Sequence, residues 1–284
     1  MPSLIDIRRR IRSVKNTQQI TKAMKMVSAA KLRRAQDRVI GARPYVTALT
    51  GILSNVAAAA ASDPEAGANP LMAERPEQKI LVVLVTADKG LAGAFNSNLI
   101  RGAQRFITEH SGAEITLELV GRKGRDFFRK RQARISGDLL FPAKPALEDI
   151  QPIAARAVDL FAKGEIDSVY LLYNEFKSVM SQKLTLTRVL PVEAPKQENP
   201  IDYIFEQPPA EMLEALLPRY VEMQFFRALQ ESVAAEHAAR MTAMDAATSN
   251  AADMIERLTL YMNRVRQASI TKEIIEVVSG AAAE

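Results

Sequence analysis

The stretch ILVVLVTADKGLAGAFNSNL, residues 80–99, decides how the middle of this chain folds. An apolar run ends at Thr86, a loop with Gly90 and Gly93 follows, and a helix-like segment comes next. A strand, a glycine-containing loop and a helix in this order hold a phosphate group in many α/β proteins. The stretch therefore raises the question of whether the chain binds a nucleotide.

The loop lacks the residues that nucleotide-binding motifs require. A P-loop reads G-x-x-x-x-G-K-[ST], in which the lysine reaches the terminal phosphates and the Ser or Thr binds magnesium. In this chain Lys89 precedes both glycines, and the dinucleotide fingerprint G-x-G-x-x-G is also missing. We therefore predict a tight strand-to-helix turn that the glycines permit, with Asn96 or Ser97 capping the helix.

Around this turn, residues 79–205 alternate between apolar strands and helical segments. The expected strands cover 79–86, 115–121, 133–141 and 168–176, and the expected helices cover 96–110, 122–131 and 146–163. Such alternation predicts an α/β domain with a largely parallel, Rossmann-like sheet. Residues 183–192 follow the last strand after a short connection, so we expect an antiparallel pair at that edge of the sheet.

A long helix is expected over residues 1–61, because no glycine or proline occurs between residues 3 and 40. Its first apolar residues are spaced by three and four, as in a coiled-coil seam. These residues are Leu4, Ile7, Ile11 and Val14. Gly41 and Pro44 are expected to interrupt the helix before it resumes.

The seam of this first helix meets polar residues when it is continued. The next two positions are Gln18 and Thr21, whereas an apolar stripe restarts one position away at Ile20, Met24 and Val27. We therefore predict that the seam shifts to the new stripe, with a local change of supercoil or of partner.

A second long helix is expected over residues 210–284, with Pro218 bending its first turns. A three-four spacing predicts its seam at His237, Arg240, Met244, Ala247, Ala251, Met254, Leu258, Tyr261, Val265 and Ala268. The part without glycine or proline, residues 219–279, would be about 90 Å long and must project from any domain of this chain. The simplest closure is a long antiparallel coiled coil of the two ends, with the α/β domain inserted after a linker over residues 62–78.

Composition narrows the possible functions. The chain has no cysteine, which excludes disulfides, thiolate metal sites and cysteine nucleophiles, and His110 and His237 are its only histidines. No apolar run approaches the roughly 20 residues that span a bilayer. The first forty residues carry a net charge of +9, against −4 for the remainder. Such a basic segment attracts phosphate, anionic lipid or an acidic protein surface.

The residues alone leave other interpretations open. The basic helix is compatible with a solvated charged face, or with a coiled-coil adaptor that binds nucleic acid. Residues 1–44 contain no aromatic side chain on which bases could stack, which disfavours single-strand binding. A nucleotide-binding α/β enzyme is the third interpretation, and the missing P-loop residues disfavour it.

Three segments together resemble the gamma subunit of the F-type ATP synthase. They are IRRRIRSVKNTQQITKAMKMVSAAKLRRAQ near the start, TADKGLAGAFNSNL in the middle and RQASITKEIIEVVSGAAA near the end. The family has these segments in the same order and spacing. Ala92 and Ala94 stand where the family commonly has cysteine or glycine.

The resemblance implies a central rotor shaft that is not itself catalytic and carries no cofactor or metal. Its terminal helices would turn inside a ring of three alpha and three beta subunits, and its α/β domain would contact the epsilon subunit and the c-ring. Rotation would couple proton flow to ATP synthesis or hydrolysis in the beta subunits. The chain would then lie at the cytoplasmic face of the bacterial inner membrane as a peripheral protein, without entering the bilayer or binding nucleic acid.

The resemblance also implies which residues touch partners. The basic positions Arg8, Arg9, Lys31 and Arg33 would face an acidic loop of the beta subunits. The glycine loop with Lys89 would be structural or would contact the moving lobes of the stator. Arg266, Gln267 and Thr271 match the residues with which the family catches a beta-subunit loop. Met24 would lie near Arg240 and Gln267 and take part in coupling.

Overall fold

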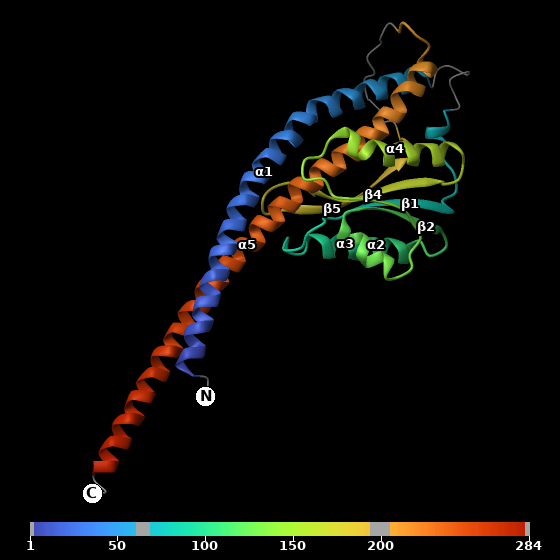
Figure 1. Cartoon of the computed structure of the whole chain (residues 1–284). Helices are drawn as coiled ribbons and strands as arrows, with labels where there is room; N and C mark the ends of the chain where they lie inside the picture. Colours follow the sequence, from blue (N-terminus) through green and yellow to red (C-terminus); the bar gives the residue numbers. More distant parts are fainter. Residues whose placement is uncertain (1–2, 61–68, 194–204, 282–284) are drawn as a thin grey trace. The chain divides into compact units, whose positions relative to one another are not determined.

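The computed structural model describes residues 3–60, 69–193 and 205–281 (Figure 1). The chain divides into two compact units. One contains the two chain ends, residues 3–29 and 240–281, and the other is Ala30–Ala239. Within the described ranges, none of the helices combines the length and the hydropathy needed to cross a membrane.

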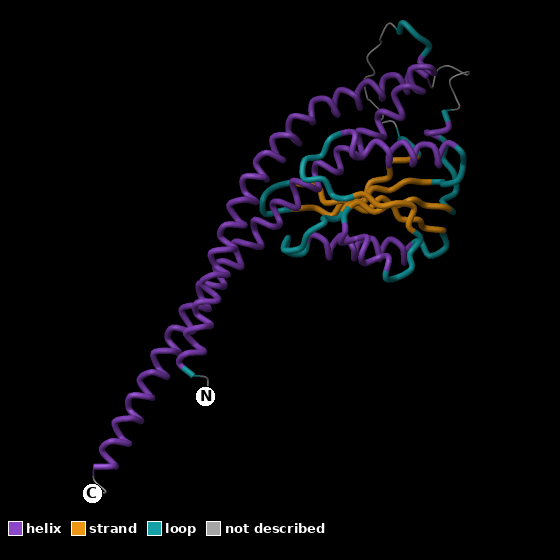
Figure 2. The backbone as a smooth tube through the Cα atoms, in the orientation of Figure 1, coloured by secondary structure: helices purple, strands orange, loops and turns teal. Residues whose placement is uncertain are grey.

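The larger unit contains a five-stranded sheet with the order β3-β2-β1-β4-β5 (Figure 2). Its strands are β1 Lys79–Val85, β2 Glu114–Val120, β3 Ile135–Leu139, β4 Ser168–Phe176 and β5 Gln182–Leu190. The first four are parallel, and β5 pairs antiparallel with β4. The predicted α/β layer and its antiparallel edge are therefore confirmed.

Three helices cover the two faces of this sheet. They are α2 Phe95–Glu109, α3 Arg122–Arg129 and α4 Leu147–Ala162. Helices α2 and α3 lie on one face and α4 on the other (Figure 1). The reason is the strand order: the chain moves outward from β1 to β3 and then returns past β1 to β4, and right-handed crossovers place the returning helix on the opposite face. The sheet thus has a topological switch point between β1 and β4.

The two terminal helices also belong to the core of this unit. They are α1 Leu4–Ala60 and α5 Pro209–Ala281. On the α4 side of the sheet, Leu53 and Val56 of α1 pack with Leu217 and Phe225 of α5 in one buried cluster with the sheet strands. Every residue of α5 from 228 to 238 is buried. The buried segment includes five polar side chains, which are Gln230, Glu231, Ser232, Glu236 and His237.

Both terminal helices are more continuous than predicted. Helix α1 continues through Gly41 and Pro44, so the predicted interruption is wrong. Pro44 is exposed, and α1 loses only one internal hydrogen bond there, while packing on both sides maintains the helix. Helix α5 likewise continues through Pro218. Of the predicted linker, residues 62–68 lie outside the described part, and Leu71 beyond them is buried in a short 3-10 helix, Pro70–Met72.

In the unit of the chain ends, α1 and α5 pair antiparallel. The Thr21 and Thr248 hydroxyls lie 2.8 Å apart, and Lys25 Nζ lies 2.6 Å from Asp245 Oδ1. A step forward along α1 is thus a step backward along α5, which confirms the predicted antiparallel pairing. Because the pairing is antiparallel, the level of any residue on the opposite helix can be counted from these two contacts.

The seam of α1 does not shift as predicted. Thr21 is 8% exposed and Ser28 3%, whereas Ile20 and Val27, which belong to the predicted stripe, are 59% and 55% exposed. The three-four spacing therefore continues through polar residues. The partner helix fixes one stripe along α1, and leaving that stripe would break the hydrogen bond between Thr21 and Thr248.

The predicted seam of α5 also slips by one position after Ala251, which is still buried. Met254 and Tyr261 are exposed, and Ile255 and Met262 are half-buried in their place. Residues 266–268 and 270–279 are exposed throughout. Counting from Thr21 and Thr248, the first turn of α1 is level with residues near 265, so α5 extends beyond the start of its partner.

Candidate functional site

The loop between β1 and α2 is held by its own side chains. Asn96 Oδ1 accepts from the Ala87 amide at 2.9 Å, and Asn96 Nδ2 donates to the Lys89 carbonyl at 3.3 Å. The Ser97 hydroxyl donates to the Ala94 carbonyl at 3.1 Å. The predicted cap is therefore wrong: α2 begins at Phe95 without a side-chain cap, and Asn96 reaches back to tie the loop instead.

The tight turn itself is confirmed, with one unexpected feature. Gly93 has a positive φ of 55°, as the glycine prediction requires, but Leu91 also has a positive φ of 64°. The Leu91 side chain is exposed. A branched residue in this conformation carries backbone strain, which the surrounding hydrogen bonds must hold.

The amino end of α3 is already occupied by a carboxylate. Asp88 Oδ1 accepts from the Arg122 amide at 2.9 Å and from the Phe141 amide at 3.2 Å. Such helix ends bind phosphate in nucleotide-binding proteins because their amides and dipole favour an anion. Here Asp88 supplies the anion from within the chain.

The carboxyl ends of β1 and β2 are locked together at glycines. The Thr86 hydroxyl donates to the Val120 carbonyl at 2.9 Å and accepts from the Gly124 amide at 2.9 Å. Gly121 has a φ of 92°, and a Cβ there would lie 2.0 Å from the Thr86 carbonyl oxygen. The sequence offered no signal for this contact beyond a glycine at the end of a strand.

Helix α5 contacts the end of β4, one of the two strands that flank the switch point. The Glu231 carboxylate, 2% exposed, accepts from the Phe176 amide at 3.0 Å through Oε2. Burial raises the pKa of Glu231, and Arg227 and Arg43 oppose that rise. This contact was not predicted, because its partners are far apart in the sequence.

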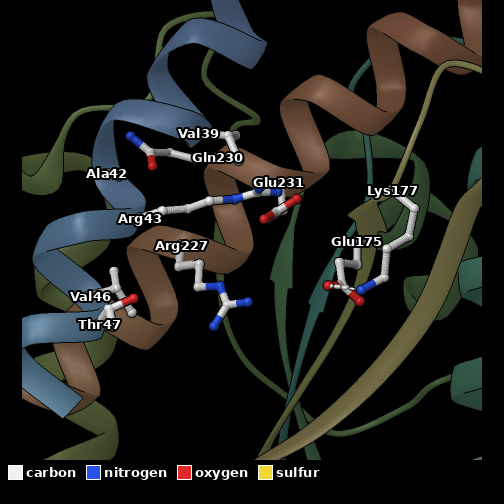
Figure 3. A pocket seen from close by; sticks show the side chains of 10 residues that line it. All are labelled: Val39, Ala42, Arg43, Val46, Thr47, Glu175, Lys177, Arg227, Gln230 and Glu231. Carbon is white, nitrogen blue, oxygen red and sulfur yellow. Dashed lines mark ion pairs between the residues drawn. The ribbon is translucent and has the colours of Figure 1, made fainter. Parts of the chain in front are cut away.

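A cleft of about 380 Å³ remains beside Glu231 (Figure 3). Its lining residues are Val39, Ala42, Arg43, Val46, Thr47, Glu175, Lys177, Arg227, Gln230 and Glu231. Lys177 Nζ pairs with Glu175 Oε1 at 2.6 Å at one side of it. Among the described residues, no group of three or more His, Asp or Glu side chains could hold a metal ion.

The predicted contact residues are distributed over both units. Lys31, Arg33 and Lys89 belong to the larger unit and are exposed, as are Arg8 and Arg9 in the unit of the chain ends. Arg266, Gln267 and Thr271 are exposed on the part of α5 beyond the start of α1. All of these side chains are accessible to a partner protein.

Met24 and Arg240 are half-buried in the unit of the chain ends. Counting from the paired Lys25 and Asp245, Met24 lies about 9 Å along the helix axis from Arg240 and about 30 Å from Gln267. The structure therefore brings Met24 to the level of Asp245 and does not bring it to Gln267.

Sequence analysis missed two surfaces. On α1, the apolar side chains Ile5, Ile20, Met26 and Val27 are exposed. Around α3, residues 122–134 contain seven basic residues and one acidic residue, and most are exposed. The apolar end of α5, which the sequence did predict, is exposed at Ile270, Ile274, Ile275, Val277 and Val278.

Comparison with known proteins agrees with this architecture. The family model described as ATP synthase matches residues 3–283. The ATP synthase gamma chain of Solibacter usitatus is 72% identical over 284 residues, covering 100% of this chain and 99% of that one. The corresponding chain of Pelotomaculum thermopropionicum is 49% identical over 287 residues, covering 100% of this chain and 99% of that one.

Solved structures share the fold at low sequence identity. A chain of the central stalk and c-ring of the Tetrahymena thermophila mitochondrial ATP synthase matches with a TM-score of 0.64 and 23% identity, over 80% of this chain and 99% of that one. A chain of the Euglena gracilis mitochondrial ATP synthase matches with a TM-score of 0.68 and 21% identity, over 99% and 94%. From its full-length relatives and the family model, the chain belongs to the ATP synthase gamma chain family.

Proposed function

We propose that this chain is the central rotor shaft of an F-type ATP synthase. It couples ion flow through a membrane ring to conformational change in a catalytic ring. The observation that carries the proposal is the antiparallel pair of α1 and α5, whose α5 end continues past its partner with exposed apolar side chains. An exposed apolar helix end of this size needs a partner surface outside the chain.

We infer that the subunit has no catalytic activity of its own. Its glycine loop lacks the phosphate-binding lysine, and Asp88 occupies the α3 amino end. Catalysis would then belong to the beta subunits. For the shaft to drive them, it must contact their open and closed states with unequal free energy.

The proposed partners are three alpha and three beta subunits, the epsilon subunit and the c-ring. Solved structures with this fold come from assemblies named for a central stalk, a c-ring and F1. In the rotor role the chain is a peripheral component at the cytoplasmic face of the inner membrane. The full-length bacterial relatives support that placement.

The proposed contacts with the beta subunits are of two kinds, long-range charge attraction and short-range polar contact. Arg8, Arg9, Lys31 and Arg33 attract an acidic beta-subunit loop over a distance of about 10 Å, without deep interlocking. Such an attraction suits a surface that must pass three partners in turn. Arg266, Gln267 and Thr271 would make the shorter-range polar contacts with a beta-subunit loop. We retain Met24 and Arg240 as coupling residues, and Lys89 as the loop contact.

The test is reconstitution followed by direct observation of rotation. Because the chain has no cysteine, an exposed Thr108→Cys on α2 provides one labelling site for a bead. The labelled chain, co-expressed with alpha, beta and epsilon subunits, should co-purify with them and turn the bead in three equal steps when ATP is added. A chain that fails to enter the complex, or a bead that stays still during ATP hydrolysis, would contradict the proposal.

A further inference from the structure

The buried segment of α5, residues 228–238, lies between α1 and the end of β4. About half of its side chains are small, at Ala228, Ser232, Ala234, Ala235 and Ala238. Small side chains let helices and sheets approach closely, but they offer shallow ridges and grooves. At these five positions packing alone gives little resistance to sliding or turning, and within the segment only Leu229 and Val233 supply large buried apolar side chains.

One polar contact in this segment does resist sliding and turning of the helix. Glu231 donates no proton when ionised and accepts the Phe176 amide at 3.0 Å, so a side chain of α5 is tied to the backbone at the end of β4. The bond lies off the helix axis. It therefore resists both rotation of α5 about its axis and translation along it.

Charged side chains from three elements line the cleft beside this carboxylate. Arg43 comes from α1, Arg227 from α5, and the Glu175–Lys177 pair from the end of β4 and the residues after it (Figure 3). Burial disfavours the ionised carboxylate, while the two guanidinium groups favour it. An apolar residue would fill this position without that desolvation cost, so the carboxylate serves a purpose other than burial.

We propose that Glu231 is a positioning residue that locks α5 against the sheet, so that torque on the helix reaches the α/β domain without slip. The inference rests on the proposed rotor function and adds the joint through which the rotor transmits force. The Ala-rich segment provides close contact, and the Glu231–Phe176 bond selects one setting among those that the packing permits.

The test compares two substitutions of Glu231 in the complete ATP synthase, reconstituted into vesicles. Glu231→Gln keeps a carbonyl oxygen that can accept from Phe176, whereas Glu231→Ala removes the acceptor. Losing one hydrogen bond to a charged group corresponds to a rise of about tenfold or more in the ratio of molecules in which α5 has slipped against the sheet to molecules in which it is locked. Gln230→Ala, on the same buried segment, is the matched control for a change of packing alone.

The measured quantity is ATP-driven proton pumping per ATP hydrolysed. We expect this ratio to fall in Glu231→Ala and to stay near the wild-type value in Glu231→Gln and Gln230→Ala. A purely structural role would lower hydrolysis and pumping in proportion and leave the ratio unchanged. An unchanged ratio in Glu231→Ala, or an equal fall in Glu231→Gln, would overturn the proposal.

If Glu231→Ala fails to assemble, a variant with a chemical cross-link between β4 and α5 tests the proposal instead. Glu175→Cys and Glu231→Cys place two thiols on the same cleft of a chain that otherwise has none. A short bifunctional thiol reagent should restore the pumping ratio, and a monofunctional reagent should not. If bridging leaves the ratio low, the joint does not act as proposed. A wild-type chain that fails to form the complex would instead refute the rotor function itself.

Discussion

Replacing Arg156 by Met should destabilise the α/β domain in a strongly pH-dependent way. Arg156 on α4 places Nη1 3.2 Å and 3.3 Å from the two carboxylate oxygens of Glu118 on β2. The Glu118 side chain is 2% exposed and the Arg156 side chain 44%. Met fills much of the same volume but leaves the Glu118 carboxylate buried without its cation.

The expected loss of unfolding free energy follows from the unequal burial of the two side chains. Removing one partner of a fully buried ion pair costs about 3–5 kcal/mol. Because Arg156 is nearly half exposed, water already screens part of its attraction, so we expect a cost of about 2 kcal/mol at neutral pH. The exposed pair of Arg129 with Asp138 is the control, and Arg129→Met should cost less than about 1 kcal/mol.

The pH dependence has a definite sign. Burial raises the pKa of Glu118 above its usual 4.5, and Arg156 opposes that rise. A carboxyl whose folded pKa is raised stabilises the fold most when protonated, below 4.5, and this stabilisation declines as the pH rises through the folded pKa. Without Arg156 the pKa of Glu118 rises further, so the fold loses more stability as the pH rises. Near pH 4 the carboxyl is largely protonated in both states, and the substitution should cost well under about 1 kcal/mol.

The assay is urea unfolding of the full chain near pH 4 and pH 7.5, followed by tyrosine fluorescence. Tyr170 and Tyr173 lie on β4 and report on the sheet. Glu118→Gln combined with Arg156→Met should recover part of the loss at the higher pH, because no buried charge remains. An equal cost of Arg156→Met at both pH values, or no recovery in the double variant, would refute the reasoning.

Three further predictions concern backbone, ligand binding and assembly. Gly121→Ala should lower the free energy of unfolding by about 3 kcal/mol or more, because the φ of Gly121 is 92° and the added Cβ would meet the Thr86 carbonyl. In the control Gly112→Ala the Cβ meets open space, so the loss should be under about 0.5 kcal/mol, and equal urea midpoints for the two variants would contradict this. The isolated chain should show no Mg-ATP binding by calorimetry, since no lysine follows the glycines and Asp88 occupies the amino end of α3; a micromolar affinity would count against it. Replacing Arg8, Arg9, Lys31 and Arg33 by Gln should flatten the salt dependence of assembly with alpha and beta subunits; an unchanged slope would mean that this basic face is only solvated.

The sequence alone determined the elements and the class of the fold. The apolar run of β1 and the alternation that follows it are local signals, and each predicted strand and helix of the α/β domain is present. The order of strands and helices also predicted the antiparallel edge at β5, because a short connection after β4 permits no crossover. The absence of a lysine after the glycines was likewise readable without coordinates.

Tertiary structure decided the details that join distant parts of the chain. Asn96 could cap α2 or tie the loop, and only the position of Ala87 selects the second. Local hydrophobicity favoured Ile20 and Val27 for the α1 seam, yet the partner helix buries Thr21 and Ser28. Glu231 and Phe176 are 55 positions apart, so no local pattern reveals their bond. Periodicity reports which faces a segment could bury, whereas the free energy of the packed and hydrogen-bonded neighbours selects the face that is buried.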